Sequence, residues 1–72
     1  MKEIGIGIIG HGFMGHEHEK MLTNMDGIRV VGISDIHPEQ LSDVRDGVKR
    51  YDSNKELFSD PEVQVVLIAA NN

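Results

Sequence analysis

Three glycines near the amino terminus have the spacing of a phosphate-binding turn. Gly10, Gly12 and Gly15 fill the pattern G-x-G-x-x-G directly after the apolar run Ile4–Ile9. In such a turn the first glycine allows a sharp reversal, the second lets a pyrophosphate reach the backbone, and the third lets the next helix pack closely. The N-terminus of that helix offers free N–H groups and a positive dipole end to an anion. We therefore expect a dinucleotide to contact the whole turn: Gly10, His11, Gly12, Phe13, Met14 and Gly15.

An aspartate follows the second apolar run. Asp35 stands twenty residues after Gly15, just past Ile28–Ile33, where the dinucleotide fingerprint has an acidic residue that binds ribose hydroxyls. The alternative is an ordinary turn or cap residue, since aspartate is common after strands. Its combination with the three glycines in one βαβ unit favours the ribose interpretation. A carboxylate there would repel a 2′-phosphate, so the sequence predicts NAD as the cofactor in preference to NADP.

Four histidines raise the question of a metal or catalytic site. His16 and His18 are two residues apart, so on a helix they lie on different faces and cannot easily converge on one ion. His11 lies within the glycine turn and could approach the cofactor, whereas His37 suits a turn better than a ribose contact. No substrate-positioning groups accompany these side chains. We therefore expect no metal ligand and no catalytic residue in these 72 residues.

The elements that must position these residues alternate between strand and helix. The apolar runs predict strands at residues 4–9, 28–33 and 63–69, and a short third strand is expected at 48–51. Helices are expected to begin at Met14, Pro38 and Ser53. In the first helix, one stripe is expected to face the core, and it consists of Met14, His18, Met21, Leu22 and Met25. Glu19 falls on the opposite, polar face of that helix.

This order of elements, β-α-β-α-β-α-β, predicts an α/β fold with a parallel sheet of the Rossmann type. Right-handed crossovers give the strand order 3-2-1-4, which makes the first and fourth strands neighbours at the topological switch point. Ligands of such sheets bind at that point. Ala69, Ala70 and Asn72 are therefore expected to face the same crevice as the glycine turn and to contact the cofactor.

Composition narrows the class of protein. The chain has 72 residues, a formal charge of −5, no cysteine and no basic cluster larger than Lys49-Arg50. These features argue against disulfides, thiolate chemistry and a nucleic-acid partner. No apolar run approaches the length of a membrane span. A cytoplasmic enzyme, or a piece of one, is the expectation.

Several of these motifs together resemble the glucose–fructose oxidoreductase and inositol dehydrogenase family, often called Gfo/Idh/MocA. The family's glycine turn is followed by a histidine three residues after the last glycine, here His18, and its second strand closes on an aspartate with a nearby Pro-Glu, here Asp35 with Pro38-Glu39. The likeness covers essentially all of the chain. It implies that residues 1–72 are the N-terminal part of a dinucleotide-binding domain.

The end of the chain reads like the family's D-P-x-V-x-x-V-x-I-A-T-P-N, beginning at Asp60. Asn72 matches the family's asparagine, but Ala70-Asn71 replaces the T-P pair, so contacts of that threonine do not carry over. Family members place a catalytic lysine in an E-K-P motif beyond this point and build the substrate pocket on a second domain. The resemblance therefore implies that this chain lacks the catalytic and substrate domain and is inactive alone.

Two classes of function follow from these observations. The resemblance implies an NAD(H)-dependent oxidoreductase that acts on a sugar, polyol or related hydroxyl compound and forms a homo-oligomer when full length. The alternative is a regulatory module that senses NAD(H) without catalysis, because its glycine turn and Asp35 would look the same. A methyltransferase is a third, weaker option, and the three-glycine spacing argues against it.

Overall fold

The computed structural model describes residues 2–69, which form four strands, two α-helices and one 3₁₀ helix. In chain order these elements are β1 (Ile4–Ile9), α1 (Phe13–Thr23), β2 (Ile28–Ser34), η1 (Pro38–Leu41), β3 (Lys49–Tyr51), α2 (Asn54–Ser59) and β4 (Val65–Ile68). All strand pairs are parallel, and the order in the sheet is β3-β2-β1-β4. The expected Rossmann-type topology is therefore confirmed.

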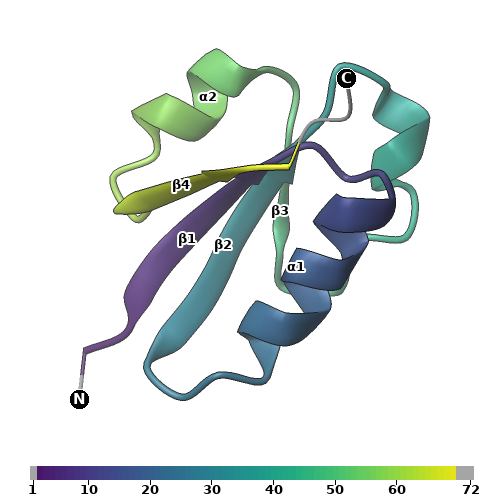
Figure 1. The fold of residues 1–72 in the computed structure, drawn as a ribbon. Coiled ribbons are helices and arrows are strands. Elements are labelled where there is room, and N and C mark those ends of the chain that lie inside the picture. Colours follow the sequence, from purple (N-terminus) through teal and green to yellow (C-terminus); the bar gives the residue numbers. More distant parts are fainter. Residues whose placement is uncertain (1, 70–72) are drawn as a thin grey trace.

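The two α-helices cover opposite faces of the sheet (Figure 1). Ile6 and Ile8 of β1 belong to the buried cluster on the face that α1 covers, with Leu22 of α1 packed against it. On the other face, a Cβ at Gly7 would lie 2.9 Å from the side chain of Leu57 in α2. Helices on both faces explain why the strands are almost wholly apolar rather than alternating.

A β-bulge interrupts the pairing of β1 with β2. Ile6 pairs with Val30 but Gly7 pairs with Gly32, so Val31 is the extra residue. A Cβ at Gly32 would lie 2.3 Å from the ring of Tyr51. The glycine in the middle of this strand therefore makes room for an aromatic side chain from β3, which a reading of hydrophobic runs does not detect.

The prediction of a longer helix from Pro38 is wrong. Only Pro38–Leu41 is helical, as a single 3₁₀ turn, although the expected apolar residues Leu41 and Val44 are buried. The following stretch contains Ser42, Asp43, Asp46 and Gly47, which are poor helix formers. Gly47 has a φ of 88°, so the chain turns there as the sequence suggested.

The methionine stripe expected to face the core is also wrong. Met14, Met21 and Met25 are 45%, 53% and 47% exposed. The buried residues of α1 are Gly15 and Glu19. The helix is rotated relative to its apolar stripe because Gly15 packs against the glycine turn and the Glu19 carboxylate has a buried partner, described below.

The two edges of the sheet differ in character. At one edge, β3 is three residues long and carries the exposed side chains of Lys49 and Arg50. At the other edge, β4 has no second strand partner within residues 2–69 and exposes Val65 and Ile68. No helix within the same residues is both long and apolar enough to cross a membrane.

Candidate functional site

The glycine turn has the backbone geometry that its sequence indicated. Gly10 has a φ of 100°, a conformation that side chains disfavour, and its N–H donates to the Ser34 carbonyl at 2.7 Å. A Cβ at Gly15 would lie 2.1 Å from the carbonyl oxygen of Gly10. The first and third glycines are therefore required for the reversal and for the close approach of α1 to the turn.

The N-terminus of α1 is open. Gly12 is its N-cap residue, in an extended conformation, and no side chain within the described residues caps the helix. No acidic residue stands in the first turn either. The N–H groups at this end of the helix are therefore available to an anion, as the motif predicts. Phe13 and Met14, which begin the helix, have exposed side chains.

Asp35 lies where β2 ends, beside the glycine turn. One carboxylate oxygen accepts the His11 N–H at 2.6 Å and the other accepts the His37 N–H at 2.7 Å. Each oxygen keeps a further lone pair that can accept a hydroxyl proton. The carboxylate is thus fixed in orientation by two backbone donors, which sequence reasoning did not foresee, and it remains able to bind a diol.

A crevice of about 370 Å³ joins these parts at the carboxyl edge of the sheet. Gly10, Gly12, Asp35 and Ala69 line it together, so the structure brings the ends of β1, β2 and β4 to one cavity. Ala70 and Asn72, which were also expected there, lie outside the described residues. Asn54 lines the crevice as well, and sequence analysis missed it.

Asn54 reaches the crevice from the first turn of α2. The buried hydroxyl of Ser34 donates to Asn54 Oδ1 at 2.5 Å. This bond fixes the amide so that its nitrogen is the remaining polar group. A donor therefore stands near the acceptor carboxylate of Asp35, and both line the same cavity.

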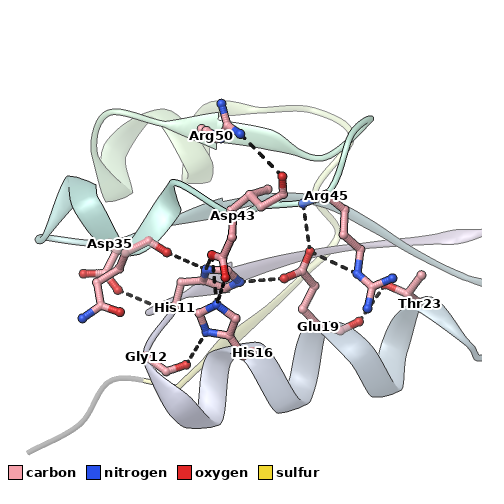
Figure 2. A network of polar contacts seen from close by, with 11 residues as sticks. His11, Gly12, His16, Glu19, Thr23, Asp35, Asp43, Arg45 and Arg50 are labelled. Carbon is pink, nitrogen blue, oxygen red and sulfur yellow. Dashed lines mark hydrogen bonds and ion pairs between the residues drawn. The ribbon is translucent and has the colours of Figure 1, made fainter.

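The side chain of His11, which was expected to approach a cofactor, does not line the crevice. It is fully buried beneath the turn, with Nδ1 2.7 Å from the Gln40 carbonyl and Nε2 2.6 Å from the Glu19 carboxylate. Figure 2 shows His11 between α1 and the segment that follows β2. Its role is to tie the glycine turn to both elements. His11 is also the hydrogen-bonding partner that a buried carboxylate requires, which explains why Glu19 can be buried.

His16 stacks on His11 and is held by two acceptors. The ring centroids are 3.7 Å apart with an interplanar angle of 25°. His16 Nδ1 lies 2.9 Å from the Gly12 carbonyl, and Nε2 lies 2.9 Å from the Asp43 carboxylate (Figure 2). The Gly12 carbonyl first, and Asp43 as well, raise the pKa of His16 above its ordinary value. The same contact lowers the pKa of Asp43.

Possible metal ligands also meet in this network, but their geometry does not suit an ion. Ligand atoms of His11, His16 and Asp43 lie within 4.8 Å of one another. The two rings are stacked, however, so their nitrogen lone pairs lie in nearly parallel planes and do not converge on one point. Carbonyl and carboxylate oxygens already occupy the nitrogens of both rings.

Comparison with known sequences gives one consistent result. Residues 4–72 match the family described as "Oxidoreductase family, NAD-binding Rossmann fold". The chain is similar to inositol 2-dehydrogenase of Burkholderia cenocepacia, with 37% identity over 90% of the chain, and to inositol 2-dehydrogenase of Serratia proteamaculans, with 31% identity over 93%. It spans about a fifth of the length of these relatives, 21% in each case.

Solved structures agree with this result. An NAD-binding protein from Listeria innocua has a TM-score of 0.88 and 33% identity, covering 100% of this chain and 21% of that one. A myo-inositol dehydrogenase from Lactobacillus casei, in complex with NAD(H) and myo-inositol, has a TM-score of 0.83 and 32% identity, covering 94% of this chain and 22% of that one. None of these matches supports the regulatory alternative.

Proposed function

The chain belongs to the Gfo/Idh/MocA oxidoreductase family, which has an NAD-binding Rossmann fold, and from this premise we propose that it is the dinucleotide-binding portion of an NAD(H)-dependent oxidoreductase. One observation carries the proposal. An uncapped helix N-terminus and an oriented acceptor carboxylate, at Gly12 and Asp35, line the same crevice. A diphosphate linked to a ribose has the two chemical groups that this pair recognises.

The residues divide the work of binding. The N–H groups at the start of α1 hold the diphosphate, and the carboxylate of Asp35 accepts hydrogen bonds from the ribose hydroxyls. Ala69, at the end of β4, lines the crevice on the side away from β2. When bound, the dinucleotide supplies the hydride chemistry, and the protein supplies orientation.

The substrate is proposed from the relatives. We infer a sugar, polyol or related hydroxyl compound because the similar curated proteins are inositol 2-dehydrogenases and the Lactobacillus casei structure contains myo-inositol. Turnover by this chain alone is not expected. Homo-oligomerisation of the full-length protein and a cytoplasmic location stay predictions.

Titration with NADH tests the proposal. We expect saturable binding by the parent chain near pH 8 and its loss in Gly12→Val, because a branched side chain would fill the approach of the diphosphate to the backbone. Gly12 has a φ of −77°, which valine can adopt, so circular dichroism should show a folded variant. Lys20→Val, at an exposed position on the same helix, is the matched control. Full affinity in a folded Gly12→Val variant would contradict the proposal.

A further inference from the structure

The first turn of α1 carries a histidine where the helix dipole disfavours positive charge. His16 is the fourth residue of the helix, and no acidic residue accompanies it in the first turn. Cations near a helix N-terminus are unfavourable, whereas anions there are favourable. A protonated histidine at this place is therefore of use chiefly when an anion is bound at the same end of the helix.

The contacts of His16 select its charged form. Its two nitrogens face the Gly12 carbonyl at 2.9 Å and the Asp43 carboxylate at 2.9 and 3.0 Å, and both partners are acceptors. A neutral imidazole has a single N–H, so its other nitrogen would turn a lone pair toward an acceptor oxygen. The imidazolium donates to both, consistent with the raised pKa of His16.

Gly12 connects His16 to the crevice. Its carbonyl accepts both the side chain of His16 and the backbone N–H of His16, the latter at 3.0 Å. Gly12 itself lines the crevice. The histidine therefore holds the residue at which the chain enters α1, on the side opposite to that which a diphosphate would approach.

Other charged groups surround the imidazole on every packed element. The ring of His11 from the glycine turn stacks on it, and Asp43 from the segment after η1 pairs with it. Glu19 of the same helix is bonded to His11 and lies 3.6 Å from Arg45. Charged groups of both signs thus lie around the stacked rings of His11 and His16. Of these groups, Asp43 contacts His16 directly.

We propose that His16 is a positioning residue of the dinucleotide site: its imidazolium fixes the Gly12 peptide and places a positive charge behind the diphosphate, so that binding strengthens with protonation of this ring. The inference rests on the proposed function and deepens it. It makes the affinity of the site for diphosphate ligands increase as the pH falls through the pKa of His16.

The sign of the effect follows from linkage. A bound diphosphate favours the imidazolium, so the pKa of His16 is higher in the complex than in the free protein, and binding takes up protons between the two values. Affinity is greatest below the free-protein pKa. It falls as the pH rises and becomes constant above the pKa of the complex.

The experiment is a titration of the chain with ADP-ribose from pH 6 to pH 9. ADP-ribose carries the diphosphate and the adenosine without the nicotinamide. We expect roughly threefold to tenfold weaker binding at pH 9, the size of a partly screened charge interaction. His16→Gln should bind with little dependence on pH. Calorimetry in two buffers of different ionisation enthalpy should detect proton uptake in the parent only.

Two controls separate His16 from His18 and His37. His18→Gln lies on the same helix and His37→Gln lies at the crevice, and both variants should keep the slope of the parent. Asp43→Asn retains the imidazole and removes its counter-charge, so the transition should move to lower pH. This variant keeps the test decisive if His16→Gln fails to fold.

The outcomes are distinct. Binding of ADP-ribose with equal affinity from pH 6 to pH 9 would overturn this inference and leave the proposed function standing. A dependence of affinity on pH that persists in folded His16→Gln, or disappears in His37→Gln, would also overturn it. Absence of binding at every pH would overturn the proposed function and the inference together.

Discussion

The two α-helices begin in opposite ways, and the difference marks where a ligand belongs. Ser53 caps α2 by accepting the Glu56 N–H at 3.2 Å, and the Glu56 carboxylate accepts the Asp52 N–H at 2.8 Å. The N-terminus of α1 has a glycine at the same place, no capping side chain within the described residues, and a histidine in the first turn. One helix satisfies its own N–H groups, and the other leaves them for an anion.

The charges that surround the two helices also respond to different ranges of pH. Beside α1, the Gly12 carbonyl and Asp43 raise the pKa of His16 above its ordinary value. At the end of α2, Asp60 accepts hydrogen bonds from Lys49 and Tyr51, both at 2.7 Å, which lower its pKa to about 2. Asp60 therefore loses its charge only in strong acid, whereas the charge of His16 is lost as the pH rises through its raised pKa.

A capping side chain at the N-terminus of α1 is expected to have the largest effect on NADH affinity, because it would remove the difference between the two helices. In Gly12→Asp, the new carboxylate would bond the first N–H groups of the helix and repel a diphosphate, so we expect NADH affinity to fall by roughly a hundredfold or more. Stability should rise by a few tenths of a kcal/mol, the usual gain of aspartate over glycine at an N-cap. NADH titration and urea unfolding of the same samples measure both effects; a variant that binds NADH normally would show that the open N-terminus is not the anion site.

Removing the acceptor beside the open helix should have the next largest effect. Asp35→Ser is expected to weaken NAD(H) about tenfold or more, since a hydrogen bond to a charged group contributes roughly 1.5–3 kcal/mol. Discrimination against NADP(H) should relax at the same time, because the repelling charge is gone. Both reduced cofactors are titrated near pH 8.

Arg50 refines this prediction. It lines a second cavity, of about 310 Å³, which shares Asp35 with the crevice. A guanidinium there can attract a 2′-phosphate once the carboxylate is removed, so adding Arg50→Gln to Asp35→Ser should reduce the gain in NADP(H) binding. Equal affinity of the parent chain for both cofactors would mean that Asp35 only orders the backbone of His11 and His37.

Removing the cap of α2 should produce the smallest effect, and only on stability. Ser53→Ala is expected to lower the free energy of unfolding by about 1 kcal/mol, because the Glu56 N–H loses its acceptor. NADH affinity should stay within twofold of the parent, since Ser53 does not line the crevice. Chemical denaturation and NADH titration of parent and variant provide the check, and a large loss of affinity would remove the contrast between the helices.

The features predictable from sequence were those fixed by local patterns. Three apolar runs located β1, β2 and β4, and the topology follows from right-handed crossovers. The capping box at Ser53 and the reversal at Gly10 were predictable because each depends on residues close in sequence. Asp35 was located by its distance from the glycines, and the structure places it at their crevice.

The remaining features depend on contacts between distant residues. Glu19 is 3% exposed because His11 lies beneath the glycine turn, and hydrophobic periodicity treats any carboxylate as solvent-facing. The pairing of His16 with Asp43 spans 27 residues, and the bulge at Val31 arises where β2 also accommodates Tyr51. The one available signal for Glu19 was its position four residues after Gly15, on the face that must meet the turn.

The two edges of the sheet differ in how readily another strand could pair with them. Lysine and arginine on a short edge strand oppose the addition of another chain, and β3 has both within three residues. The opposite edge, at β4, presents exposed Val65 and Ile68 beside backbone groups that no further strand within residues 2–69 occupies. Within the described residues, a further parallel strand could therefore pair with β4, whereas the charges on β3 oppose one at the other edge.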